Sequence, residues 1–191
     1  YFEFHRGTYT SMARNKRGNR KSEYAMMELE LLSVLAEKAG KAYPTEELNR
    51  MWEMILTNQF HDILPGSSIH EVYEQTKKEY AEIAETSAKL IGERLDALCA
   101  KKDESVTVWN TLGHRRNDIV ELGTNSAEAL TDGTNVYPVQ QTKDGAVIYA
   151  ENLPSKGYQV LRPVSGSVVK TPFAIAEAGE GYTLETPFYT I

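Results

Sequence analysis

The spacing of apolar residues changes once along the chain, and this change limits the folds that the chain can adopt. Between residues 22 and 98, apolar side chains recur every three or four positions, with breaks at Gly40 and at Pro65-Gly66. Beyond residue 103 the apolar runs are short and alternate with polar residues, and Asp-Gly and Ser-Gly turn signals separate them. We therefore predict an α+β fold, in which an antiparallel three-helix bundle precedes an incomplete antiparallel β-sandwich.

This pattern divides the chain into three segments. Residues 1–21 are expected to form a short extended run and a polar, basic, solvated connector. Residues 22–102 would be the helical bundle, and residues 103–191 the first part of the β domain. The sequence opens without an initiator Met and closes on an alternating run that resembles a strand in need of partners. We therefore expect a piece of a longer protein.

Local signals mark the expected helix ends within the bundle. Pro44 followed by Thr45 is a typical start for the second helix. Ser68 and Glu71 have the spacing of a capping box, which would begin a long third helix.

Composition excludes several classes of protein. Hydrophobic residues make up 41% of the chain and charged residues 25%, as in globular proteins that bury a core. The net charge of −6 argues against a nucleic-acid partner, and the single cysteine excludes an internal disulfide. The sequence lacks both a run near the ~18 apolar residues of a membrane span and a signal peptide. We therefore expect no membrane partner and a cytoplasmic location.

The stretch "TNQFHDILPGSS" places two ionisable residues, His61 and Asp62, where the second helical pattern stops. A neutral imidazole suits zinc, and a carboxylate can bind a metal or accept hydrogen bonds from hydroxyl groups. Adjacent residues diverge by about 100° within a helix, but at a helix end both can face one pocket. On spacing alone, the commoner explanation is that His61 caps the helix and Asp62 is a turn residue.

A longer set of motifs resembles the α-mannosidases of glycoside hydrolase family 38, especially the bacterial members. The motifs are "FEFHRGTYTS", "QFHDILPGSS" and, after a long helix, "VTVWNTLGHRRNDIVEL". The resemblance implies that residues 1–21 end an α/β catalytic domain, that His61 is a zinc ligand, and that Asp62 binds sugar hydroxyls. Arg6 and Tyr9 would line the sugar pocket. Phe60 stands where eukaryotic members have a first histidine, which leaves the substrate preference open.

The family resemblance also implies a reaction. Members are retaining enzymes with an aspartate nucleophile and a separate carboxylic acid, and both residues would lie upstream of Tyr1 together with the other ligands of the Zn²⁺ cofactor. The substrate would be an α-mannoside or a mannosylated small molecule such as mannosylglycerate, and a homo-oligomer is left open. We expect the isolated 191 residues to be inactive. The alternative is a non-catalytic carbohydrate-binding or assembly module in which the His-Asp pair is only a cap.

Overall fold

The computed structural model describes most of the chain and divides it into two compact units, residues 1–101 and 102–191. The first unit is helical and the second is made of antiparallel strands, so the predicted α+β fold is confirmed. The residues that the structure describes are 6–99, 104–166, 174–179, 181–186 and 188–191.

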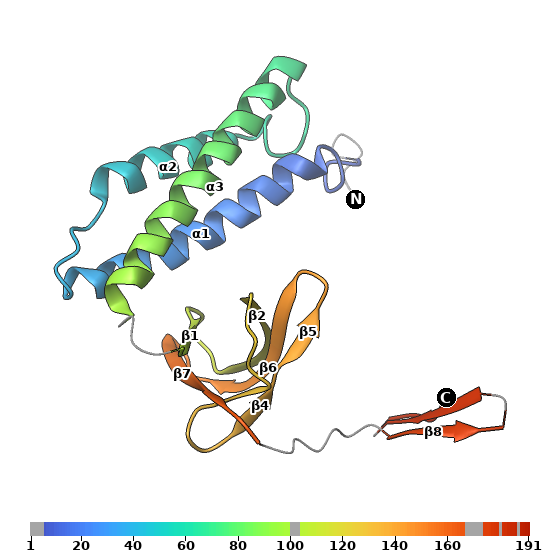
Figure 1. Ribbon diagram of the computed structural model, residues 1–191. Coiled ribbons are helices and arrows are strands. Elements are labelled where there is room, and N and C mark those ends of the chain that lie inside the picture. Colours follow the sequence, from blue (N-terminus) through green and yellow to red (C-terminus); the bar gives the residue numbers. More distant parts are fainter. Residues whose placement is uncertain (1–5, 100–103, 167–173, 180, 187) are drawn as a thin grey trace. The chain divides into compact units, whose positions relative to one another are not determined.

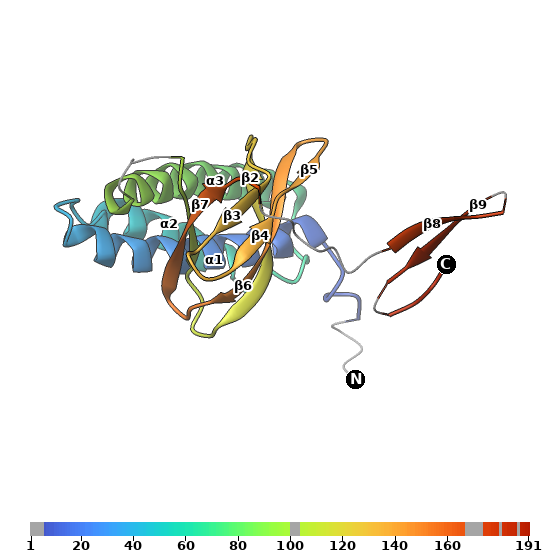
Figure 2. The same cartoon turned by 60° about the horizontal axis from the view of Figure 1, so that its bottom comes forward.

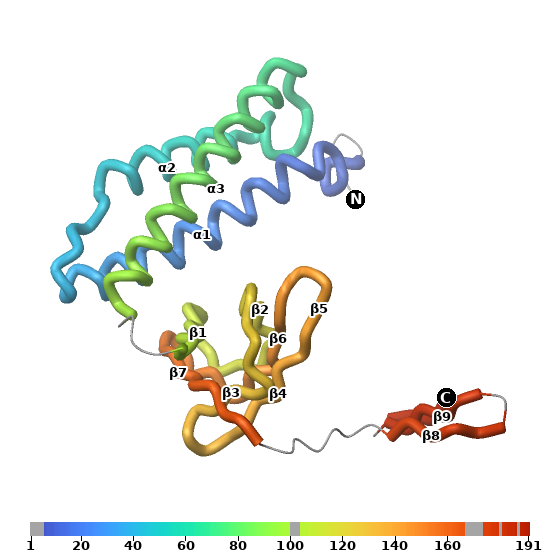
Figure 3. Tube along the Cα trace, in the orientation of Figure 1, coloured from blue at the N-terminus to red at the C-terminus, as the bar shows by residue number. Residues whose placement is uncertain are grey.

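The described part of the first unit contains three helices, α1 (Ala13–Glu37), α2 (Thr45–Asn58) and α3 (His70–Leu98) (Figure 1). The tube trace in Figure 3 shows that α1 and α3 run in the same direction while α2 runs in the opposite one. All three pack on a common apolar core. The buried members of this core are Met26, Leu29, Leu48, Met51, Ile55, Ile83 and Leu90.

The start of α1 differs from the sequence-based expectation. The helix begins at Ala13, so the basic run expected to be a solvated connector is part of the bundle. Its inward positions are Asn15 and Asn19, which are only 3% and 7% exposed. Because these buried residues are polar, the hydrophobic pattern did not reveal that this stretch is helical.

Of the other two helix starts, one agrees with the sequence-based prediction and one does not. The start of α2 at Thr45, after Pro44, confirms the prediction. The predicted capping box is wrong, because Ile69 is the residue that precedes α3 and no side chain caps the helix there. The backbone N–H of Ser68 instead donates to the hydroxyl of Tyr73, 3.0 Å away.

A glycine lets α1 and α3 approach closely. A Cβ placed on Gly18 would lie 2.6 Å from Cδ2 of Tyr80, far inside a normal contact. Burial, with smaller contributions from the charges of Glu79 and Glu23, raises the pKa of Tyr80 to about 12. By contrast, a Cβ at Gly92 in α3 would meet no described atom within 4 Å.

The second unit contains two sheets that pack face to face and a separate hairpin (Figures 1 and 2). The first sheet has the order β1-β7-β3-β4, the second β2-β6-β5, and the hairpin is β8-β9. The core takes Leu130, Tyr137 and Leu161 from one sheet and Ile148, Ala150 and Leu153 from the other. The strands are β1 (Val106–Asn110), β2 (Arg116–Gly123), β3 (Ala129–Thr131), β4 (Val136–Pro138), β5 (Gln140–Thr142), β6 (Gly145–Leu153), β7 (Gly157–Val164), β8 (Ala174–Ala178) and β9 (Gly181–Glu185).

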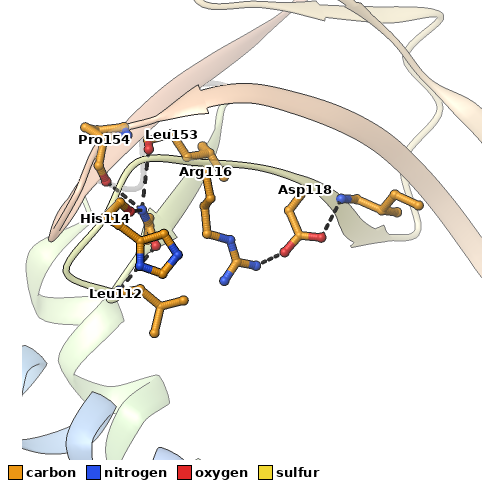
Figure 4. Close-up of polar contacts among 8 residues, drawn as sticks. Leu112, His114, Arg116, Asp118, Leu153 and Pro154 are labelled. Carbon is orange, nitrogen blue, oxygen red and sulfur yellow. Dashed lines mark hydrogen bonds and ion pairs between the residues drawn. The ribbon is translucent and has the colours of Figure 1, made fainter.

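A buried asparagine joins two turns of this unit. Asn110 is 3% exposed, and its amide nitrogen donates to the carbonyls of His114 (2.8 Å) and Pro154 (2.9 Å). The same nitrogen also donates to the carbonyl of Leu153 over 3.4 Å. Figure 4 shows His114, Leu153 and Pro154 together, and in the same view the Arg116–Asp118 ion pair. Because amides of this kind satisfy carbonyls that the strands leave unpaired, Asn110 fixes both turns at one end of the unit.

None of the helices in the described part of the chain combines the length and the apolar character needed to cross a membrane.

Candidate functional site

The α2–α3 loop, residues 59–69, carries the two residues that the sequence singled out. The end of α2 is closed by backbone groups: the N–H of Gln59 donates to the carbonyls of Ile55 and Leu56, and the N–H of Phe60 to that of Thr57. Donors from the backbone therefore already satisfy carbonyls in this last turn. A capping role for the His61 side chain is not needed to explain how the helix ends.

His61 and Asp62 converge at the surface of the loop. The His61 Nε2 and Asp62 Oδ2 atoms are 3.3 Å apart, and the two side chains are 76% and 59% exposed. The ring of Phe60 lies against the imidazole, with 4.1 Å between the ring centroids. Adjacent residues can point the same way here because the backbone has left the helix, as the sequence argument required.

Asp62 is also tied to the rest of the loop. The hydroxyl of Ser67 lies 3.4 Å from Asp62 Oδ1, and the hydroxyl of Tyr73 donates to the carbonyl of Ile63 over 3.2 Å. Tyr73 belongs to α3 and is only 4% exposed. A buried phenol thus holds the backbone beneath an exposed carboxylate.

The first turns of α1 hold the loop from the other side (Figure 3). The amide of Asn15 donates to the carbonyl of Ile63 (3.3 Å), and Lys16 Nζ donates to the carbonyls of Leu64 (3.0 Å) and Pro65 (3.2 Å). Burial lowers the pKa of Lys16. Sequence analysis had assigned both residues to a solvated connector, and only the basic character of the run marked them.

A network of polar side chains secures the end of α2, just before the pair. The amide of Gln59 donates to Asn19 Oδ1 and to Glu23 Oε1, each over 2.9 Å. The amide of Asn58 donates to Glu79 Oε2 over 2.9 Å. The network therefore joins the last turn of α2 to both α1 and α3.

The N-terminal turn, residues 6–12, lies beside the loop. The carbonyl of Gly7 accepts hydrogen bonds from the backbone N–H groups of Thr10 (3.1 Å) and Ser11 (2.8 Å). Ser11 touches the loop at Gly66, where an added Cβ would lie 2.7 Å from Ser11 Cβ. Arg6 and Tyr9 are both exposed on this turn, Tyr9 by 93%.

The donor set can be compared with what a metal needs. An imidazole nitrogen and a carboxylate oxygen are both ligands that zinc accepts, and His61 and Asp62 are accessible from solvent. Among the described residues, no three His, Cys, Asp or Glu side chains cluster closely enough to hold a metal ion. The pair fits a shared site to which other residues would contribute, because zinc is normally held by at least three protein ligands.

Comparisons with known proteins agree on one family. Residues 3–98, which include the α2–α3 loop, match the family described as "Alpha mannosidase middle domain". The chain belongs to the family of the α-mannosidase middle domain.

Several α-mannosidases show how far the likeness extends. The chain is 37% identical to human alpha-mannosidase 2C1 over 126 residues, covering 64% of this chain and 12% of the human protein. It is 26% identical to alpha-mannosidase G of Dictyostelium discoideum over 187 residues, covering 84% of this chain and 17% of that protein. The chain thus spans less than a fifth of either relative.

A solved structure shares the fold. The crystal structure of an alpha-mannosidase from Enterococcus faecalis V583 matches 96% of this chain and 29% of its own, with a TM-score of 0.62 at 14% identity. The match therefore extends over both the helical unit and the β unit of this chain.

Proposed function

We propose that this α-mannosidase chain supplies the carbohydrate-facing end of the middle domain in a zinc-dependent retaining enzyme that hydrolyses α-mannosides. In this proposal His61 is one zinc ligand and Asp62 binds hydroxyl groups of the sugar. The nucleophile and the general acid/base would come from the remainder of the protein.

One observation carries the proposal: His61 Nε2 and Asp62 Oδ2 lie 3.3 Å apart and exposed, on a loop inside the stretch that matches the α-mannosidase middle domain. Exposed side chains that satisfy no structural need are candidates for binding. The helix end that His61 would otherwise cap is closed by the N–H groups of Gln59 and Phe60.

The roles of the chain's own residues follow from their chemistry. The imidazole of His61 can donate a lone pair to a metal when it is neutral, and the Asp62 carboxylate can accept hydrogen bonds from two hydroxyl groups. When bound, zinc would supply Lewis-acid chemistry and orient the hydroxyls of the mannose. Ser67 and Tyr73 would keep Asp62 and its backbone in place.

Arg6 and Tyr9 belong to the same proposal, as residues that line the sugar pocket. Support comes from their place on the N-terminal turn, which touches the α2–α3 loop where Ser11 meets Gly66. An aromatic ring can cover the apolar face of a sugar, and a guanidinium can donate to several hydroxyl oxygens.

The test uses the full-length natural protein and an aryl α-mannoside. Hydrolysis is measured before chelation, after chelation, and after zinc is added back. His61→Ala should lose nearly all activity while its unfolding midpoint changes little, and Asp62→Asn should lower kcat/KM at least tenfold. His70→Ala is the matched control, because His70 is exposed in the first turn of α3. It should hydrolyse the substrate like the natural protein.

The possible outcomes separate the competing functions. Metal-dependent hydrolysis that His61→Ala abolishes supports the proposal. If hydrolysis of mannosylglycerate is found and that of the aryl mannoside is not, the reaction class stands but the substrate is a mannosylated small acid. An enzyme that stays active in His61→Ala and changes only its stability, by about 1 kcal/mol, would return His61 to a capping role.

A further inference from the structure

Lys16 makes an unusual set of contacts. Its ammonium group donates to three backbone carbonyls: that of Ser11 in the N-terminal turn, and those of Leu64 and Pro65 in the α2–α3 loop. An ammonium has three N–H donors, so all three are used on backbone oxygens. Hydrogen bonds from a charged donor are stronger than those between neutral groups.

The three carbonyls come from segments that are distant in the sequence. Residue 11 lies five positions before Lys16, whereas residues 64 and 65 lie 48 and 49 positions after it. One side chain thus fastens the N-terminal turn and the α2–α3 loop to the same point on α1. The two segments also touch each other directly, because Gly66 packs on Ser11.

A neighbouring contact acts on the same stretch. Asn15, one residue before Lys16, donates to the carbonyl of Ile63. The three residues that follow Asp62 in the chain therefore each give a carbonyl to α1, at positions 63, 64 and 65. The backbone that carries His61 and Asp62 is fixed immediately after the pair.

We propose that Lys16 is a positioning residue, which holds the α2–α3 loop and the N-terminal turn together so that His61 and Asp62 keep one fixed placement. Because its ammonium donates to backbone carbonyls, it acts on the pair through the backbone. The consequence for catalysis rests on the proposed mannosidase function. The consequence for the loop does not, because it follows from the contacts alone.

The variants distinguish the ammonium from the rest of the side chain. Lys16→Met keeps most of the stem and removes the three donors. Lys16→Arg keeps a charge and donors in a planar arrangement, and is the conservative variant. Lys38→Met is the matched control, because Lys38 is exposed just past the other end of α1.

The first measurement is amide hydrogen exchange in the full-length natural protein. Informative amides are those of Ile63, Leu64 and Gly66, which donate to carbonyls within the loop, and those of Thr10 and Ser11 in the N-terminal turn. In Lys16→Met these amides should exchange at least tenfold faster than in the natural protein. The exchange rates of the Met51 and Ile55 amides, in the core of α2, should not change. Lys16→Arg should lie between, and Lys38→Met should match the natural protein.

The second measurement is hydrolysis of the aryl α-mannoside with zinc in excess. Lys16→Met should lower kcat/KM at least tenfold, with partial recovery in Lys16→Arg and no loss in Lys38→Met. A merely structural lysine would lower the unfolding midpoint without this recovery and without the local change in exchange.

The results separate two failures. If Lys16→Met exchanges like the natural protein at residues 63–66, the proposal is overturned whatever the activity. If exchange rises but kcat/KM equals that of Lys38→Met, the contact exists and the positioning role is overturned. If the unmodified protein hydrolyses no mannoside, the proposed function fails, and exchange alone decides whether Lys16 holds the loop.

Discussion

Replacing Gly66 with alanine tests whether the α2–α3 loop is tightly fitted against the N-terminal turn. Gly66 has a φ of +100°, and an added Cβ would lie 2.7 Å from Ser11 Cβ and 3.3 Å from the Ser11 carbonyl carbon. Gly40 provides the matched control, because its φ of +84° carries a similar backbone strain while a Cβ there meets no described atom within 4 Å. The difference between the two variants isolates the contact with the N-terminal turn, at Ser11 and Met12.

The expected magnitudes follow from these two terms. A non-glycine residue in a left-handed backbone conformation lowers the free energy of unfolding by about 1–2 kcal/mol, and this applies to both variants. Forcing a methyl group into a packed contact costs about 1–3 kcal/mol more, and only Gly66→Ala meets that cost. Gly66→Ala should therefore destabilise the helical unit by about 2–5 kcal/mol and Gly40→Ala by about 1–2 kcal/mol.

Urea unfolding of the chain, followed by the helical circular dichroism signal, measures both values, and hydrogen exchange at residues 63–66 locates the change. If the loop moves away from Ser11 to relieve the clash, exchange rises there and the global loss is smaller. Equal destabilisation by the two variants, with unchanged exchange in the loop, would refute the tight fit.

Three further predictions concern other parts of the chain. Gly92→Ala should stabilise the helical unit by about 0.5–1 kcal/mol, because alanine has the higher helix propensity and its methyl group meets no described atom. Gly18→Ala should destabilise the unit, because there the methyl group meets the ring of Tyr80. Thermal unfolding gives the sign of each change. Asn110→Ala should cost the β unit about 1–3 kcal/mol, measured by urea unfolding, because one buried and two part-buried carbonyls lose their donor. Hydrogen bonds to the Asp132 carboxylate hold its pKa well below the usual range, and the bond from the Asn135 backbone N–H has the largest effect. Their stabilisation should be complete above about pH 4 and fall as the pH drops toward the folded-state pKa, and Asp132→Asn should flatten this acid dependence in unfolding curves recorded from pH 5 to 2.

The sequence predicted the elements that have a regular apolar pattern. The start of α2 after Pro44 and the change from helices to strands both follow from side-chain periodicity, and both are confirmed. The alternating apolar pattern that indicates strands does not extend to β3 and β8. β3 has three residues and is too short to show alternation, and β8 reads "AIAEA", in which alanine carries little strand preference.

The candidate site shows a different limit. The His-Asp pair was visible because two ionisable residues stood at a helix break, and the structure brings their side chains together. The residues that hold the loop were not visible, because Asn15 and Lys16 act on backbone carbonyls about 48 positions away. A hydrogen bond to a carbonyl leaves no trace in the identity of its partner, so spacing rules cannot find it. The roles of Arg6 and Tyr9 stay a prediction.

The polar network at the end of α2 gives the bundle a fixed alignment. Apolar cores tolerate repacking and lose a unique arrangement before they lose stability, so an apolar core alone defines the relative height of helices weakly. Sliding α1 along α2 would take Asn19 Oδ1 and Glu23 Oε1 away from the Gln59 amide. The oxygen of the buried Asn19 side chain and the half-buried Gln59 amide would then lose these hydrogen bonds. One end of the bundle thus sets the alignment of the helices while the apolar core supplies most of the cohesion. The α2–α3 loop, which carries His61 and Asp62, follows directly after the end where that alignment is set.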